Sequence, residues 1–204
     1  MKNLTKCFGL TLLIWLTLNT FIFSLETLKK NQPKITRGPL KISADETTST
    51  DKGKMIEAHG NVHIRYELES EDILVSNSNF ARYNEQESLG ELTGNPKATW
   101  FRKDPLQPST FLTAETILLK IKDEGLIARG NVKVIQASST LTAQEIIFSN
   151  PDKKLIAQGE KPKFNVLEKD HHTLIEADKI TAWTEKREIE FNGKVEGTVF
   201  LNQK

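Results

Sequence analysis

One pattern occurs five times along the chain, and this repetition constrains the fold more than any other feature of the sequence. In each copy, a small residue is followed 16 positions later by a glycine. Successive glycines are 34, 36, 29 and 34 residues apart. A constant inner spacing with variable outer spacing predicts one structural unit joined by loops of different length. The pairs are Ala44 and Gly60, Ser78 and Gly94, Ala114 and Gly130, Ala143 and Gly159, and Ala177 and Gly193.

Apolar residues inside each unit alternate with polar ones, as in a strand with one wet and one dry face. Val62, Ile64 and Tyr66 show this period clearly. The glycine is followed by asparagine in the first three copies, and both residue types tolerate a positive φ, so we expect a bend or bulge there. The polar residue after each small residue is expected to satisfy local backbone N–H groups; these residues are Asp45, Asn79, Glu115, Gln144 and Asp178.

These units predict an all-β fold, with two to three short strands in each unit. The segment Leu112–Lys122 has a pattern that a helix could also produce, but the corresponding segment in the next copy runs into Asn150-Pro151, so we interpret it as strand. Hairpins that stack along one axis and all bend at the same point build a sheet folded over an apolar crease.

Charge and motifs exclude several classes of function. The chain has 28 Lys and Arg against 27 Asp and Glu, a net charge of +1, which provides no strong positive field for nucleic acid. It contains no Gly-x-Ser-x-Gly elbow, no phosphate-binding glycine loop and no His-Glu-x-x-His motif. We therefore expect a protein that is not an enzyme, with no cofactor and no metal.

The N-terminal region predicts export. Residues 1–24 combine a short basic start with an apolar stretch from Phe8 to Phe23, the layout of a signal peptide, although a retained membrane anchor is the alternative. Residues 25–39 are expected to form a linker, and residues 40–204 the folded domain. The only cysteine is Cys7, so a mature chain that has lost the leader contains no disulfide.

The repeated Ala44-Asp45, Ala114-Glu115 and Ala177-Asp178 pairs, with their Gly-Asn-Val and Gly-Asn-Pro corners, resemble the repeat of the LptA/OstA family of periplasmic lipopolysaccharide-transport proteins. The resemblance covers residues 40 to 201 and departs from the family in the fourth and fifth copies, which lack Gly-Asn. It implies a twisted, open-ended β-jellyroll whose inner groove shields acyl chains. It also implies other transport subunits with such domains as partners, and homo-oligomers that join head to tail by edge strands and bridge the inner and outer membranes.

The alternating apolar side chains would line that groove, although ordinary core packing also explains their alternation. The residues expected to face lipid are Ile56, Val62, Ile64, Ala98, Trp100, Leu112, Leu119, Val132, Val134, Ile146, Phe148, Phe164, Val166, Ile180, Phe191, Val195 and Val199.

Two further interpretations remain open at this point. A retained leader would make the chain an inner-membrane subunit like the LptC members of the same export system. A filled interior would make it a structural β-solenoid filament without a ligand.

Polar clusters receive plainer interpretations. Adjacent His171 and His172 are expected in a loop, and His59 and His63 have no third metal ligand nearby. The acidic run from Glu67 to Asp72 is expected on a solvated edge.

Overall fold

The fold was analysed in a computed structural model, which describes residues 40–186 and 188–201. The leader (residues 1–24) and the linker (residues 25–39) expected from the sequence lie outside the described residues. The described residues form one sheet of sixteen strands, with a single 3₁₀ turn at Asp51–Gly53. The first eight strands are β1 (Lys41–Ser43), β2 (Glu46–Thr50), β3 (Met55–Glu67), β4 (Ile73–Asn84), β5 (Leu89–Thr93), β6 (Lys97–Phe101), β7 (Thr110–Thr113) and β8 (Thr116–Lys120). The other eight are β9 (Gly125–Gln136), β10 (Ser139–Ser149), β11 (Lys154–Gln158), β12 (Lys163–Leu167), β13 (His171–Glu176), β14 (Lys179–Trp183), β15 (Glu188–Asn192) and β16 (Glu196–Leu201).

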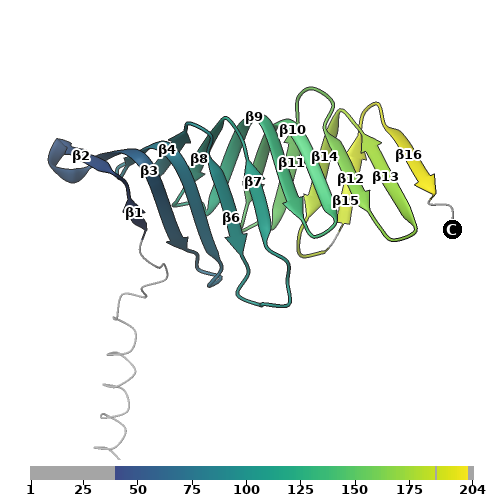
Figure 1. Cartoon of the computed structure of the whole chain (residues 1–204), viewed down its shortest axis with the longest axis horizontal. Helices are drawn as coiled ribbons and strands as arrows, with labels where there is room; N and C mark the ends of the chain where they lie inside the picture. The colour runs from purple at the N-terminus through teal and green to yellow at the C-terminus, as the bar shows by residue number, and fades with distance from the viewer. Residues whose placement is uncertain (1–39, 187, 202–204) are drawn as a thin grey trace, which may run out of the picture. The chain divides into compact units, whose positions relative to one another are not determined.

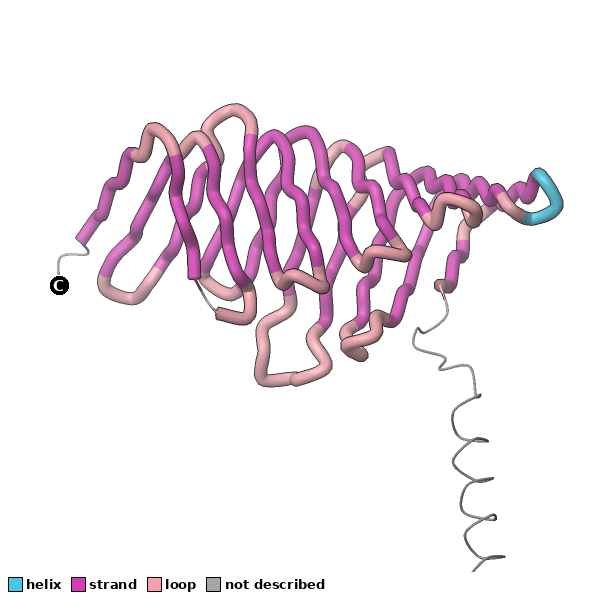
Figure 2. The backbone as a smooth tube through the Cα atoms, turned by 180° about the vertical axis from the view of Figure 1, so that it is seen from behind, coloured by secondary structure: helices cyan, strands magenta, loops and turns pink. Residues whose placement is uncertain are grey.

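The sheet folds over on itself and forms two walls, visible as front and back layers in Figure 1 and from behind in Figure 2. We call the run β1-β3-β4-β6-β7-β9-β10-β12-β13-β16 the first wall. The run β2-β3-β4-β5-β8-β9-β10-β11-β14-β15 is the second wall. Strands β3, β4, β9 and β10 are long enough to cross the crease and belong to both walls, and all pairings are antiparallel.

The repeated residues build the crease. Gly60 and Asn61 have φ angles of 70° and 43°, so two consecutive left-handed residues turn β3 from one wall into the other. Asp45 lies between β1 and β2, the two strands that pair with β3 on this side. Its N–H donates to the carbonyl of Gly60 at 3.0 Å. The side-chain amide of Asn61 donates to the Asp45 carboxylate at 2.8 Å. The spacing of 16 residues therefore sets which two positions face each other at the bend.

The same contact explains why the corner residue has no side chain. At Gly94, an added Cβ would lie 2.8 Å from Cβ of Asn79, closer than real side-chain carbons approach. At Gly60, Gly130 and Gly193 an added Cβ would meet the acidic side chain of the preceding pass. In the fourth copy, which lacks asparagine, Glu160 and Lys161 take the positive φ angles of 43° and 45°.

The structure confirms the expected fold class: an all-β jellyroll built from repeated bent hairpins. The segment Leu112–Lys122 contains strands β7 and β8, as the sequence predicts. The polar residue after the small one contacts a backbone N–H as expected in the last copy, where the N–H of Lys194 donates to Asp178 at 2.9 Å. In the first and third copies, Asp45 and Glu115 accept from asparagine side chains instead. In the part of the chain that the structure describes, no helix is long and apolar enough to cross a membrane.

Candidate functional site

Aligned rows of inward side chains follow the strand register along each wall. In an antiparallel sheet, paired residues point to the same face, so a chain of pairings defines one continuous row. On the first wall, one inward row is Ile42, Ile64, Ser76, Ala98, Leu112, Val134, Leu141, Phe164, Ile175 and Gly197. The row on the second wall is Ser49, Ile56, Tyr83, Gly90, Leu119, Leu126, Phe148, Leu155, Ala182 and Ile189.

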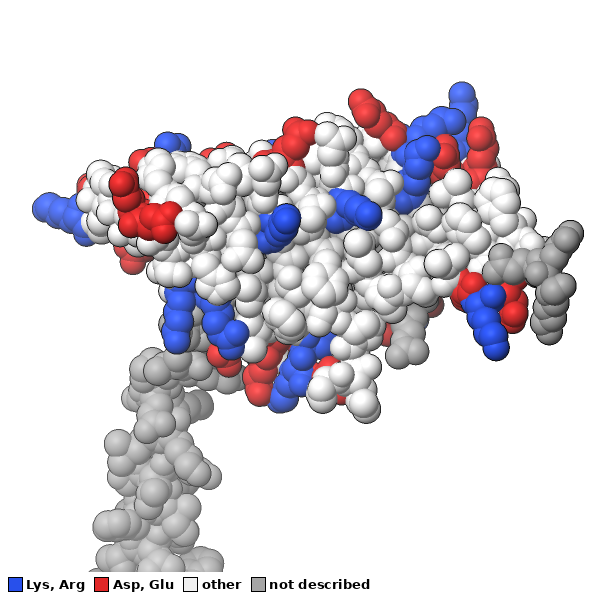
Figure 3. All heavy atoms as spheres, in the orientation of Figure 1, with Lys and Arg blue, Asp and Glu red and all other residues white. Residues whose placement is uncertain are grey.

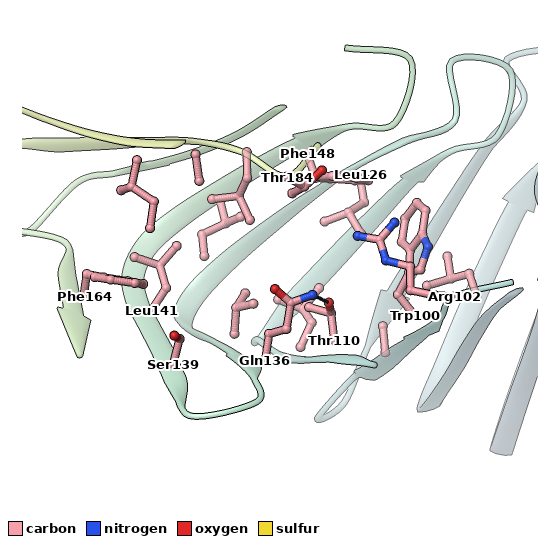
Figure 4. A pocket seen from close by; sticks show the side chains of 18 residues that line it. Trp100, Arg102, Thr110, Leu126, Gln136, Ser139, Leu141, Phe148, Phe164 and Thr184 are labelled. Carbon is pink, nitrogen blue, oxygen red and sulfur yellow. Dashed lines mark hydrogen bonds between the residues drawn. The ribbon is translucent and has the colours of Figure 1, made fainter. Parts of the chain in front are cut away.

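Between the walls, in the C-terminal half of the sheet, lies an apolar pocket of about 190 Å³. Trp100 and Arg102 stand at one end of this pocket, and Leu141 and Phe164 stand toward the other (Figure 4). Polar side chains are few, and Gln136 donates to the hydroxyl of Thr110 at 3.0 Å. The pocket is lined by Leu74, Ala98, Trp100, Arg102, Thr110, Leu112, Leu126, Val134, Gln136, Ser139, Leu141, Ile146, Phe148, Leu155, Phe164, Ala182, Thr184 and Ile189.

The N-terminal half of the same space is filled by side chains. Tyr66 and Leu68 are each 3% exposed and Leu119 is 2% exposed. The two small cavities in this half measure about 10 Å³ each, about the smallest space that holds one water molecule. The groove is therefore closed in one half of the molecule and hollow in the other.

Hydrogen bonds also join the two walls across the rim, the side of the groove opposite the crease. The Tyr66 hydroxyl donates to the carbonyl of Ile121 at 3.4 Å, and the N–H of Glu69 donates to the Glu124 carboxylate at 2.8 Å. Glu124 also accepts from the amide of Asn150 at 2.6 Å. Tyr66 and Glu69, which make these contacts between the walls, both lie in the N-terminal half of the sheet.

Trp100 stands between the closed and the hollow halves. Its indole N–H donates to the Asp72 carboxylate at 3.0 Å, and its ring meets Phe148 of the second wall edge to face, with centroids 4.8 Å apart. Arg102 donates to the same carboxylate at 3.2 Å, and its guanidinium lies 5.7 Å from the centre of the Trp100 ring. The rotamer of Trp100 is thus fixed from three sides.

Asp72 is 6% exposed, although the sequence placed it on a solvated edge. That interpretation was wrong for this residue, because its carboxylate is turned inward onto Trp100 and Arg102. Burial alone would raise the pKa of Asp72, but hydrogen bonds from the backbone N–H of Lys103, from Trp100 and from Arg102, together with the charge of Arg102, hold this pKa below its usual value. The carboxylate is therefore ionised at neutral pH.

A polar compartment of about 860 Å³ adjoins the apolar pocket at the rim. The two share Arg102, Gln136 and Thr184. Lysines and carboxylates line the compartment together: Lys103 and Lys153 beside Asp104 and Glu185. Figure 3 shows that charged side chains on the visible face gather along its upper and lower margins, with a mostly uncharged band between them. An apolar space beneath a polar rim matches the two parts of an amphiphile.

The residues expected to line a groove fall into three groups. Seven line the hollow pocket: Ala98, Trp100, Leu112, Val134, Ile146, Phe148 and Phe164. Six others point inward but lie away from it, in the packed half or along the crease: Ile56, Val62, Ile64, Leu119, Val132 and Ile180. Four lie in the C-terminal strands or in the loop between β15 and β16, where burial is incomplete: Val166, Phe191, Val195 and Val199.

Val195 and Val199 are 48% and 57% exposed, respectively. Val199 nevertheless continues the inward row that contains Trp100, Gln136 and Val166, because β16 pairs in register with β13. Its exposure follows from its place on the last strand, which no further strand covers within the described residues.

Eleven of the residues that line the pocket are absent from the sequence-based set. Ala182 and Ile189 lie two positions from the predicted Ile180 and Phe191, so a strict count by two along β14 and β15 could have found them. Leu141 and Leu155 occupy the same inward rows as predicted residues, but the register shift between Ala143 and Glu145 breaks the period along β10, and β11 held no predicted residue to count from. Leu74 and Leu126 also follow this period. The polar residues of the lining could not be found by a search for alternating apolar residues: Arg102, Thr110, Gln136, Ser139 and Thr184.

The histidines take structural positions. His171 and His172 begin strand β13, so the expected loop position was wrong; His172 contacts Asn165 at 2.7 Å and stacks on Phe200. His59 packs on Phe80, and His63 contacts Asn77 at 2.9 Å. Among the described residues, no three His, Cys, Asp or Glu side chains gather as metal ligands would.

Comparison with known proteins agrees with this architecture. Residues 111–198 match the family described as LptA/(LptD N-terminal domain) LPS transport protein. The crystal structure of LptH from Pseudomonas aeruginosa, described as the LptA-homologous periplasmic component of the conserved lipopolysaccharide transport device, superimposes with a TM-score of 0.52. The two chains share 15% identity, and the match covers 64% of this chain and 95% of that one. No curated protein matches the sequence.

Proposed function

We propose that this chain is a periplasmic lipopolysaccharide-transport protein of the LptA/OstA-like family. The sequence match over residues 111–198 and the shared fold support this proposal. It would shield acyl chains of lipopolysaccharide, or of a related glycolipid, between its two walls. The protein would act by binding and passing on its ligand, without a catalytic step.

The apolar pocket beneath the polar rim is the observation that carries this proposal. Each methylene removed from water contributes about 0.8 kcal/mol, so a dozen-carbon chain gains on the order of 8 kcal/mol before ordering costs. No catalytic group is needed for that affinity. The shared residues Arg102, Gln136 and Thr184 would lie where the acyl chain meets the headgroup.

The size of the pocket limits what it holds as it stands. An apolar cavity of about 150 Å³ in another protein binds benzene. At about 190 Å³, this pocket therefore accommodates part of one acyl chain, not several chains. A multi-chain lipid requires the walls to move apart, and we place that movement in the C-terminal half, which already holds the hollow pocket.

Strand addition would join copies into a bridge between membranes. Within the described residues, β1 and β2 pair only with β3, β15 pairs only with β14, and β16 pairs only with β13. Each end thus presents unpaired backbone groups, which a neighbour of the same fold would satisfy. The partners are other subunits with such domains and further copies of this chain.

The location of the protein depends on whether the leader is cleaved or retained. Removal of residues 1–24 would release the domain of residues 40–204, with residues 25–39 as its linker, into the periplasm. A retained leader would make it an inner-membrane subunit like the LptC members. N-terminal sequencing of the purified protein distinguishes them, because an intact start at Met1 or Lys2 supports the anchored form.

Photo-crosslinking in cells tests lipid binding directly. A photoreactive amino acid at Val134 or Phe164, which line the pocket, should yield glycolipid adducts. The matched control is Ile135, the next residue of β9, whose side chain points to the opposite face. Absence of adducts at both groove positions would contradict lipid binding and favour a ligand-free filament.

A further inference from the structure

We propose that Trp100 divides the groove, so that acyl chains occupy only the C-terminal side of this residue. This proposal rests on the proposed function, because it assigns the part of the groove in which the lipid lies.

The first argument is the space on each side of the indole. The C-terminal side holds the pocket of about 190 Å³, whereas the cavity directly behind Trp100 measures about 10 Å³. That cavity is lined by Tyr66, Leu74 and Leu119, which are each at most 5% exposed. A space of that size holds at most one water molecule, so no methylene chain fits there.

The second argument is that the division is built from both walls. Trp100 comes from β6 of the first wall, and Phe148, which it meets edge to face, comes from β10 where that strand runs in the second wall. The pair therefore spans the groove from wall to wall. In Figure 4 the indole lies at one end of the pocket, opposite Leu141 and Phe164.

The third argument is that the indole is held in place. Asp72, itself 6% exposed, accepts the indole N–H, a hydrogen bond from Arg102 and the backbone N–H of Lys103. Rotation of Trp100 out of the groove would separate the indole N–H from Asp72 and remove one of the three hydrogen bonds of this buried carboxylate, so it is disfavoured. Tyr66 and Glu69 also fasten the rim on the closed side.

A tail-labelled lipid tests this division. The probe is a long-chain fatty acid with a diazirine at its terminal carbon, which is added to the purified protein, irradiated and mapped by peptide mass spectrometry. In the wild type, we expect adducts around Leu141, Phe164 and Ile189, and none at Ile64, Tyr66 or Leu119.

Substitution of the indole should open the closed side. In Trp100→Ala, labelling should extend to Tyr66 and Leu119, and the Kd of long chains should fall about fourfold for each further methylene that becomes buried. Trp100→Phe should keep the wild-type pattern, since a ring still faces Phe148. The matched control is Trp183→Ala, because Trp183 lies on the opposite face of β14 from the inward Ala182.

The outcomes separate this proposal from the function on which it rests. Wild-type adducts at Ile64, Tyr66 or Leu119 would overturn the division while leaving lipid binding intact. Unchanged labelling in a folded Trp100→Ala variant would overturn the role of Trp100. Absence of adducts anywhere on the inward rows would contradict lipid binding itself. If Trp100→Ala does not fold, the wild-type map and Trp100→Phe still decide the question.

Discussion

Gly130 illustrates how single residues determine the crease. It has a φ of 77°, and an added Cβ would meet the side chain of Glu115 on the neighbouring pass. Both the backbone angle and the contact exclude a side chain there, whereas the neighbouring Asn131 takes a φ of 45° and donates to Glu115 at 2.6 Å.

We expect Gly130→Ala to lower the free energy of unfolding by about 1–3 kcal/mol, measured by urea denaturation. Gly90→Ala is the matched control. Its φ is not in the left-handed region, and an added Cβ would lie 3.6 Å from Cβ of Leu119, an ordinary contact. That variant should differ from the wild type by less than about 1 kcal/mol. Equal losses in the two variants would contradict the role assigned to the corner.

Asp72 provides a prediction that depends on pH. Because its pKa is lowered in the folded protein, its stabilising contribution is present above the unfolded value near 3.8 and is lost as pH falls through the folded pKa. Asp72→Asn should therefore cost about 1–3 kcal/mol at neutral pH, and the stability curves of the two proteins should converge below pH 3.8.

Glu71→Gln is the control for this prediction. Glu71 pairs with Lys103 at 2.6 Å, but both side chains are more than half exposed, so the loss should stay below about 1 kcal/mol at every pH. A constant difference between wild type and Asp72→Asn across the acidic range would show that ionisation of Asp72 is not the source of the effect.

Strand β16 is the element with the most exposed apolar side chains. Val199, Phe200 and Leu201 are 57%, 51% and 78% exposed, and the strand pairs only with β13. At the other edge, β2 consists of Glu, Thr and Ser residues, all exposed. The two edges therefore differ in chemistry, and an apolar edge strand invites pairing with another chain.

Charges on this edge should block self-association. We expect the double variant Thr198→Lys with Phe200→Lys to remain monomeric in sedimentation velocity at concentrations where the wild type forms oligomers. Phe111→Lys is the control, since Phe111 is 50% exposed but lies on β7, which has partners on both sides. A wild type that stays monomeric throughout would contradict head-to-tail assembly by this edge.

The sequence predicted the positions of the bends and the inward faces of the strands, because both follow a regular spacing. It did not predict which part of the groove is packed and which is hollow, because that depends on the distance between the walls. The spacing of 16 residues located the bends, and alternation identified the inward faces of β3, β9 and β12. Periodicity cannot distinguish Ile64, in the closed half, from Val134, in the pocket, because both satisfy the same pattern. The Trp100–Phe148 contact was also beyond the sequence, since it joins strands that do not pair.

For the molecule as a whole, side chains fill the space between the two walls in the N-terminal half of the described sheet and leave it hollow in the C-terminal half. Native-state hydrogen exchange should follow this order, because amides in regions with little buried apolar surface open most readily. We expect β15 and β16 to exchange fastest and the central part of β3 and β9 to exchange slowest.

The same experiment should reveal ligand binding. Addition of purified lipopolysaccharide should slow exchange mainly in β10, β12 and β14, the strands around the hollow pocket. The closed half around β3 and β4 provides the internal reference and should change little. Protection that begins in β3 and β4 would place the ligand on the wrong side of Trp100.

The corners have a consequence for how such a protein could grow or shrink. The β3–β4 and β9–β10 pairs cross the crease in the same way, each with one register shift there. Duplication of one unit would therefore add one more pair of strands that bend at the crease. Removal of an inner unit would shorten the groove by the length of one such pair. The length of groove open to the proposed lipid would then change in steps of one whole unit.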